Sequence, residues 1–430
     1  MTAPLKVAIA GLGTVGAGTL TLLQFQADLI AARAGRPITV VAVSARDRRR
    51  HREVVLDGLR WYDDAAQMAA EADIDVVVEA IGGAEGIALA VCRAAIAGGR
   101  HLVTANKALL ALSGVELAAE AEAKGVTLGF EAAVAGGIPI IKAIRQGLAG
   151  NRLNQVTGIL NGTCNYILTT MRACGRDFAA VLAEAQALGY AEADPSFDID
   201  GIDTAHKLTI LTSLAFGTRV DFGKVHIEGI RHVSALDIRY AEELGYRIKL
   251  LGIARRTEAG IEQRVHPCMV PIGSMIGRVE GVFNAVLAEG DFVGRTLFEG
   301  RGAGAGPTAS AVVSDLIDIA AGRQGPAFGI PASQLAPLQA APMSAHIGAY
   351  YIRLMVQDHP GVFADVAAAL RDAQVSMEAV LQRGRAPGET VPVVMTVHDT
   401  SEASMVQAMS RISHLAAVVE PPRLIRIEPF

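Results

Sequence analysis

The sequence predicts an α/β protein of several domains, with a parallel-sheet domain first and a small βαββαβ domain last. Three observations predict this class. The 430 residues are too many for one core, and 51% of them are hydrophobic. The chain opens with an apolar strand, a glycine-rich turn and a helical pattern. It closes with alternating strand and helix patterns after a segment rich in Pro, Ala and Gly.

The composition of the chain limits the classes of binding partner that we expect. A net charge of −5 with 19% charged residues gives no reason to expect nucleic-acid binding, and no apolar stretch is long enough to predict a membrane span. The four cysteines lack metal-ligand spacing, and MTAPLK leads into a strand without a signal-peptide pattern, so we expect a reducing cytoplasm. One local basic cluster stands out: Arg46, Arg48, Arg49, Arg50 and Arg52.

The first element is a buried strand at Lys6–Ala10, followed by a turn of the form GxGxxG and a helix to about Arg33. In such a turn the first glycine permits the tight bend, the second admits a pyrophosphate, and the third allows close helix packing. The residues of this candidate cofactor site are Gly11, Leu12, Gly13, Thr14, Val15 and Gly16. Further strands are expected at Ile38–Val43, Ile74–Val78, His101–Thr104 and Val126–Phe130. This order predicts a Rossmann-type NAD(P)-binding domain.

The end of the second strand bears on the choice of cofactor. No acid follows Ser44 to hold a ribose hydroxyl, whereas Arg46 and its neighbours suit a 2′-phosphate. We therefore expect NADP(H) to be preferred. A solvated arginine loop is the alternative, and Asp47 could still serve the ribose of NAD(H).

Lys107 follows the fourth strand at its carboxyl end, the edge of a parallel sheet where ligands bind. Position alone fits a role toward cofactor or substrate and an ordinary surface lysine equally well.

The stretch 189–211 gathers acids ahead of Lys207: Glu192, Asp194, Asp198, Asp200 and Asp203. A helix is expected from Ile202 through Leu211, which would place Asp203 and Lys207 on one face. A cation held among acids can exchange protons with a substrate. The plainer alternative is a surface ion pair of little consequence.

Five segments, taken in order, resemble homoserine dehydrogenase: FEAAVAGGIPI (130–140), ILNGTCNYIL (159–168), GYAEADP (189–195), GIDTAHK (201–207) and GRGAGAGPTASAVVSDLIDIA (300–320). The resemblance implies reversible reduction of L-aspartate 4-semialdehyde to L-homoserine on the route to threonine and methionine. The carbonyl oxygen needs a proton or a hydrogen-bond donor, which a lysine can supply.

The resemblance also implies individual roles. Lys207 would be the general acid/base, with Asp203 and Lys107 completing the catalytic set; substrate binding would involve Gly189, Glu192, Asp198 and Asp203. Gly304 aligns with a family glycine near the cofactor. A structural monovalent cation, usually sodium, would be held by Glu131, Val134, Gly136 and Ile138. Without the resemblance, that last segment reads as a strand-to-helix hinge around flexible glycines.

Cys164 offers a competing chemistry, a thiol nucleophile that forms a thioester. No histidine base lies nearby in the sequence, although the distant His206 stays open as a partner. Two further alternatives are another NADP-dependent aldehyde or hydroxy-acid oxidoreductase and a non-catalytic amino-acid sensor on the same fold.

The expected domains are a nucleotide domain of residues 1–134 plus about 303–322, an α+β catalytic and dimerisation domain of 135–302, a linker of 323–347 and a terminal domain of 348–430. Six elements are expected in the last: strand Tyr350–Val356, helix Gly361–Ala373, strands Val375–Gln382 and Val391–Val397, helix Glu402–Ser413 and strand Val418–Ile427. This is the ferredoxin-like order.

The segment VQDHPGVFADVAAAL resembles the ACT domain, a module that commonly binds amino acids. Its turn is formed by Asp358, His359 and Pro360, and Gly361 leaves backbone N–H groups free at the helix start for a carboxylate. We expect threonine as the candidate effector, with a simple dimerisation module as the alternative. A homodimer or homotetramer is expected.

Overall fold

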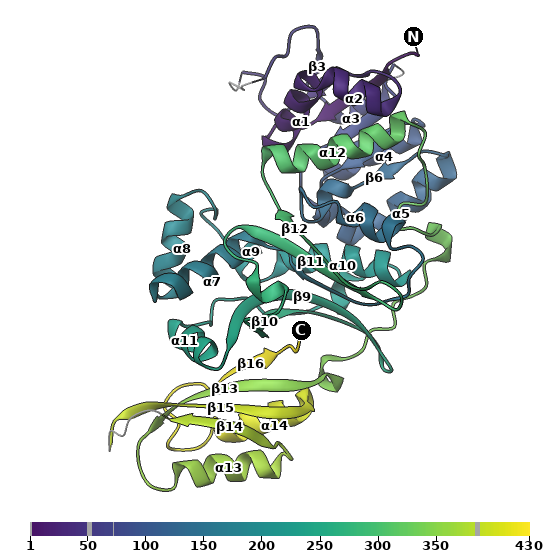
Figure 1. The fold of residues 1–430 in the computed structure, drawn as a ribbon. Coiled ribbons are helices and arrows are strands. Elements are labelled where there is room, and N and C mark those ends of the chain that lie inside the picture. The colour runs from purple at the N-terminus through teal and green to yellow at the C-terminus, as the bar shows by residue number, and fades with distance from the viewer. Residues whose placement is uncertain (1, 50–53, 72, 383–387) are drawn as a thin grey trace.

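The computed structural model describes residues 2–49, 54–71, 73–382 and 388–430. Arg50 and Arg52 of the basic cluster lie outside the described residues. The elements are arranged as an N-terminal sheet domain, a central sheet with helices, and a C-terminal sheet domain whose last residues return to the centre (Figure 1).

The N-terminal domain is built on a six-stranded parallel sheet of order β3-β2-β1-β4-β5-β6. Its strands are β1 Leu5–Ala10, β2 Ile38–Ser44, β3 Arg60–Tyr62, β4 Val76–Glu79, β5 His101–Thr104 and β6 Leu128–Gly129. Its helices are α1 Thr14–Phe25, α2 Ala27–Ala34, α3 Ala65–Ala70, α4 Ile87–Ala97 and α5 Lys107–Lys124. The strand order reverses between β1 and β4, and in open parallel sheets ligands bind beyond the carboxyl ends of the strands at this point.

The predicted strands of this domain are confirmed, with ends that differ by a few residues. The first helix differs from its prediction, because it ends at Phe25 and a second helix begins at Ala27. The chain leaves helical geometry at Gln26, where φ is −110° and ψ is 25°. Strand β3 was missed because three residues are too few to show a pattern.

Helix α12, Ala305–Ala320, packs against α1 although about 290 residues separate their starts (Figure 1). The close approach depends on Gly18, where an added Cβ would lie 2.7 Å from the Ala305 carbonyl oxygen. The returning helix therefore places its first turn beside the glycine-rich end of α1.

A ten-stranded sheet forms the rest of the molecule, in the order β12-β11-β7-β9-β10-β16-β13-β15-β14 with β8 paired to β10. The central strands are β7 Leu153–Ile159, β8 His226–Ile227, β9 Tyr246–Thr257, β10 Gly260–Pro271, β11 Phe283–Gly290 and β12 Gly294–Arg301. The helices around them are α6 Ile140–Lys142, α7 Gly162–Cys174, α8 Phe178–Ala187, α9 Ser196–Ile199, α10 Ile202–Phe216 and α11 Ala235–Glu243. Helix α10 meets β9 at Gly252, whose missing side chain admits Thr204.

The C-terminal part has the predicted βαββαβ order: β13 Ile347–Gln357, α13 Val362–Asp372, β14 Met377–Gln382, β15 Thr390–Ser401, α14 Glu402–Ile412 and β16 Arg423–Ile427. Its internal strand order is β16-β13-β15-β14, which is that of a ferredoxin-like domain. Strand β16 also pairs in parallel with β10, so that the two sheets are one. No local sequence pattern predicts this continuity.

The segment expected to be a linker, residues 323–347, packs against neighbouring elements. Phe328 is buried with its ring centroid 5.3 Å from that of Phe130. Ala336 bridges to Thr218, and Ala340 bridges to Ile261. The segment thus lies against the nucleotide domain and the central sheet on its way to β13.

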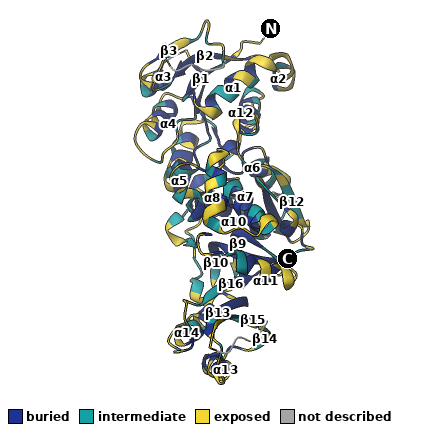
Figure 2. Ribbon diagram, turned by 90° about the vertical axis from the view of Figure 1, so that its left-hand side faces the viewer, coloured by how far each residue is buried: buried dark blue, intermediate teal, exposed yellow. Residues whose placement is uncertain are grey.

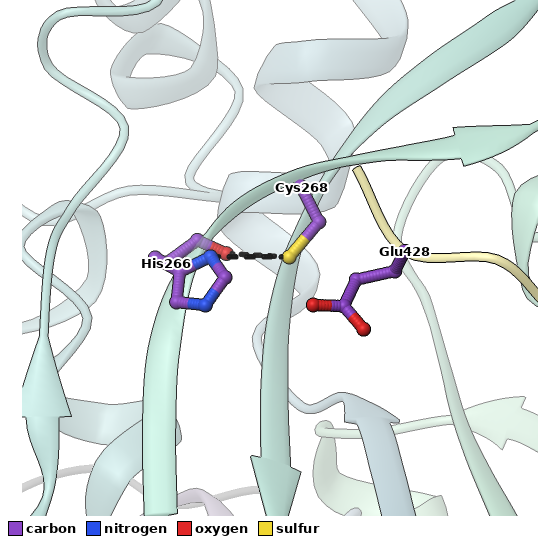
Figure 3. Close-up of side chains that lie close together, drawn as sticks. All are labelled: His266, Cys268 and Glu428. Atoms are coloured by element: carbon purple, nitrogen blue, oxygen red, sulfur yellow. Dashed lines mark hydrogen bonds between the residues drawn. The ribbon is translucent and has the colours of Figure 1, made fainter. Parts of the chain in front are cut away.

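A buried group of His266, Cys268 and Glu428 lies where the C-terminal tail meets β10 (Figure 3). These side chains could hold a metal ion by type and spacing. Arg264 Nη1, however, donates to Glu428 and lies 3.0 Å from His266 Nε2. A guanidinium in that place already balances the carboxylate and would repel a divalent cation, so the group is an ionic contact between tail and sheet.

Buried residues are concentrated in the strands of both sheets, with exposed residues on the outer helices (Figure 2). Among the described helices, none combines the length and the apolar character needed to cross a bilayer.

Candidate active site

The glycine-rich turn lies at the reversal point of the first sheet. A Cβ on Gly11 would lie 2.5 Å from the Ala80 carbonyl oxygen, and one on Gly16 would lie 1.8 Å from that of Gly11. Around Gly13, in contrast, the described residues leave open space, and none of their side chains caps α1 there. The first N–H groups of α1 are therefore accessible to a phosphate, which fits a dinucleotide.

Leu12 is buried, whereas Thr14 and Val15 form the first turn of α1. Gly304 precedes α12 with φ of +121° and so lies at the helix start that packs against α1. Arg46 is exposed on the loop after β2. The predicted cofactor residues thus gather at one edge of the sheet.

Glu79, at the end of β4, was not singled out from the sequence. It is fully buried, and its Oε1 accepts the N–H groups of Ile81 at 2.8 Å and Gly82 at 3.0 Å. Its Oε2 accepts the hydroxyl of Thr104, at the end of β5. The sequence does contain a signal for Glu79: it is an acid at the end of the apolar run VVVE, at the carboxyl edge of a sheet.

Helix α10 brings Asp203 and Lys207 together as expected, and both are buried. Lys207 Nζ donates to Asp203 Oδ2 at 2.7 Å and to the Leu160 carbonyl oxygen at 2.7 Å. Within the described part of the chain, these bonds use two of the three ammonium donors and leave one for a ligand oxygen. The arrangement is not a solvated surface pair.

Lys107, the first residue of α5, reaches the same carboxylate from the other domain. Its Nζ lies 3.1 Å from Asp203 Oδ1 and 5.5 Å from the ring centroid of Phe197. The two lysines therefore share one aspartate at the junction of the nucleotide domain and the central domain.

The acids of the site have shifted pKa values. Burial by itself would raise the pKa of Asp203, but the ammonium groups of Lys207 and Lys107 lower it to about 2. Burial raises the pKa of Asp198, and the charge of Asp203 raises it further. Asn161 donates to both carboxylates.

Glu192 and Gly189 lie on the exposed loop between α8 and α9. The backbone carbonyl of Glu192 accepts a hydrogen bond from Gln186 Nε2 at 3.0 Å. The loop is held to α7 by Thr163, whose hydroxyl donates to the Tyr190 carbonyl at 2.7 Å.

Cys164 is fully buried, and its Sγ lies 3.3 Å from the carbonyl oxygen of Asp198. Burial, together with the nearby charges of Asp198 and Asp203, raises the pKa of the thiol well above its usual range. A thiolate nucleophile is thereby disfavoured, and the alternative based on Cys164 loses its chemical basis.

The candidate cation segment is a buried turn with φ of +55° at Ala135 and +43° at Gly136. The carboxylate of Glu131 accepts the N–H groups of Ile141 and Lys142, each at 2.9 Å, at the start of α6. Burial, with repulsion from Asp315, raises the pKa of Glu131 to about 7. A nearby cation would stabilise the ionised form of this buried carboxyl group, so the oxygen ligands of the segment fit a cation site. Val134 and Ile138 are buried beside Glu131.

In a comparison with known proteins, three family models match successive parts of the chain. Residues 11–131 match the NAD binding domain of homoserine dehydrogenase, residues 139–317 match homoserine dehydrogenase, and residues 350–415 match the ACT domain.

Relatives match over the full length. Homoserine dehydrogenase of Pseudomonas aeruginosa is 47% identical and that of Neisseria gonorrhoeae 46%, each over 99% of this chain and 99% of the relative. A solved homoserine dehydrogenase from Thiobacillus denitrificans is 48% identical with a TM-score of 0.94, and covers 99% of both chains. The chain therefore belongs to the homoserine dehydrogenase family.

Proposed function

We propose that this oxidoreductase reversibly reduces L-aspartate 4-semialdehyde to L-homoserine, with Lys207 as general acid/base. The observation that carries the proposal is the buried ammonium of Lys207, which is held by Asp203 and the Leu160 carbonyl with one donor to spare. It lies at the junction that Lys107 reaches from the nucleotide domain.

The nicotinamide cofactor, when bound at the glycine-rich turn, supplies or accepts the hydride. In the reducing direction, Lys207 donates a hydrogen bond to the carbonyl oxygen and then a proton as that oxygen becomes a hydroxyl. Asp203 orients the ammonium, and its low pKa of about 2 keeps it ionised throughout. Lys107 adds a second positive charge beside the developing oxyanion.

The substrate carries an ammonium and a carboxylate besides its aldehyde. We assign Glu192, Gly189 and Asp198 to its binding, with Glu192 facing the ammonium. Glu192 is exposed on its loop, and closure of this loop over the ligand would bring the carboxylate to the ammonium.

We also propose that NADP(H) is preferred over NAD(H). Ser44 ends β2 with no acid directly after it, and Arg46 is exposed on the loop that follows. Replacing Arg46 with alanine should raise KM for NADPH far more than for NADH. An equal rise for both cofactors would contradict the preference.

A structural sodium ion at Glu131, Val134, Gly136 and Ile138 is a further proposal. It is supported by the pKa of Glu131 of about 7, because a bound cation would relieve the penalty for ionising this buried acid. At pH 8, NaCl should raise the melting temperature more than choline chloride at the same ionic strength. Equal melting temperatures in the two salts would contradict the proposal of a structural sodium ion.

We propose that the ACT domain binds threonine at the turn from Asp358 to Gly361 and that the enzyme assembles as a homodimer or homotetramer. A cavity of about 100 Å³ lies beside this turn, between β13 and α13. Isothermal titration with threonine tests the effector, and sedimentation velocity tests the assembly. Absence of threonine binding would leave the domain with a role in assembly.

A spectrophotometric assay tests the main proposal. Oxidation of NADPH with aspartate semialdehyde is the expected result. Oxidation only with other carbonyl compounds would indicate another aldehyde or hydroxy-acid oxidoreductase, and amino-acid binding without turnover would indicate a sensor.

A further inference from the structure

Asn161 lies between the two acids of the site and contacts both of them. Its Nδ2 donates to Asp198 Oδ1 at 2.8 Å and to Asp203 Oδ2 at 2.9 Å. Its Oδ1 accepts the N–H of Cys164 at 2.8 Å, which caps the start of α7. Both amide hydrogens and the carbonyl oxygen have partners, so the side chain is fixed in one orientation.

The amide determines how the Asp203 carboxylate faces the two lysines. Oδ2 accepts from Asn161 and from Lys207, and Oδ1 is then the oxygen that faces Lys107 at 3.1 Å. Rotation of this carboxylate would break at least one of the three contacts. Asn161 therefore holds it in the orientation that serves both ammonium groups.

The amide also suits the charges around it. Asp198 and Asp203 are neighbouring acids whose negative charges repel each other. A neutral side chain with two donors stabilises both carboxylates. It adds no third negative charge, whereas an aspartate in the same place would add one.

We propose that Asn161 is a positioning residue, which orients Asp203 between Lys207 and Lys107 and ties Asp198 to the same amide. This inference rests on the proposed function and extends it to a residue that acts through the two acids. It assigns the asparagine of ILNGTCNYIL to the catalytic geometry and not only to a helix cap.

The test compares Asn161→Ser with Asn165→Ser. Serine at 161 keeps a helix cap but removes both amide donors. Asn165 is a matched control, because it is likewise buried, in the first turn of α7. Among the described residues, its Nδ2 donates only to the carbonyls of Val279 and Phe283, away from the acids.

In Asn161→Ser we expect the acidic limb of the pH profile of kcat/KM to move up by about one unit, because the carboxylates lose donors to their charged forms. We expect kcat to fall roughly 10- to 100-fold through misplacement of the lysines, with KM for NADPH little changed. Asn165→Ser should lower the melting temperature and leave the limb in place. An unmoved limb in active Asn161→Ser, or equal shifts in both variants, would overturn the proposal.

A crystal structure of Asn161→Ser decides the question even if the wild-type enzyme does not reduce aspartate semialdehyde, a result that would count against the proposed function alone. We expect the Asp203 carboxylate to turn and its contact with Lys107 to lengthen beyond 4 Å. An Asp203 carboxylate in the wild-type orientation would overturn the role of Asn161.

Discussion

At the scale of single residues, the site depends on one shared carboxylate. Asp203 accepts from Lys207 at 2.7 Å and lies 3.1 Å from Lys107. Each lysine comes from a different domain, so neither domain alone forms the site. The contact also explains why Asp203 stays ionised although it is buried.

The first prediction concerns Lys207. Lys207→Ala should lower kcat by roughly 10²- to 10⁴-fold, the range typical for loss of a general acid/base. Steady-state kinetics with NADPH measures the effect, and circular dichroism checks that the fold is kept. Near-normal kcat in a folded variant would remove Lys207 from this role.

The second prediction concerns Cys164. Because its thiol is buried and its pKa is raised, Cys164→Ser should keep most of the activity. Kinetic assays of the variant, alongside wild type, measure this. A loss of activity as large as that expected for Lys207→Ala would support the thioester mechanism instead.

At the scale of elements, the sequence predicted most pieces correctly, because strong periodicity and glycine-rich turns are local signals. The helix at 202–211 is confirmed and extends to Phe216, so Asp203 and Lys207 share its face. Contacts between segments far apart in the chain have no local pattern in the sequence that would predict them. The bond from Asn161 to Asp203 joins residues 42 apart, and the pairing of β16 with β10 joins segments even farther apart in the chain.

Helix α6 provides a prediction at this scale, because Glu131 accepts the N–H groups at its start. The folded protein keeps a proton on Glu131 up to a pKa of about 7, whereas the unfolded chain releases it near the ordinary value of 4.5. Stability from this group is therefore full below pH 4.5 and is lost as pH rises through 7, by on the order of 3 kcal/mol.

Glu131→Gln should remove this dependence. Urea unfolding of wild type and variant between pH 5 and 8, in sodium-free buffer, measures it. The difference in unfolding free energy between the two proteins should shift in favour of the variant as the pH rises. A constant difference would show that Glu131 does not titrate in this range.

At the scale of the whole molecule, the ACT domain is not a tethered module. Strand β16 extends the central sheet through β10, and Arg353 Nε on β13 donates to Asp237 Oδ1 on α11 at 2.7 Å. Arg426 also contacts Glu228 at 2.9 Å across the same junction. The ACT domain is therefore joined to the same sheet on which α10 packs.

Glu428→Gln tests how firmly the tail holds the two parts together. Arg264 is 1% exposed, so loss of the Glu428 charge should destabilise the protein by about 3 kcal/mol, as for other broken buried pairs. Thermal unfolding measures this, with the exposed Glu378→Gln as the control. Equal melting temperatures for the two variants would show that the tail contributes little.

A crystal structure with NADP⁺ and homoserine would show whether Lys207 serves the reacting oxygen. In this complex, Lys207 Nζ should lie within about 3 Å of the homoserine hydroxyl, with Asp203 still bonded to that ammonium. A hydroxyl bound by other groups, with Lys207 beyond hydrogen-bond distance in a closed complex, would contradict this role of Lys207.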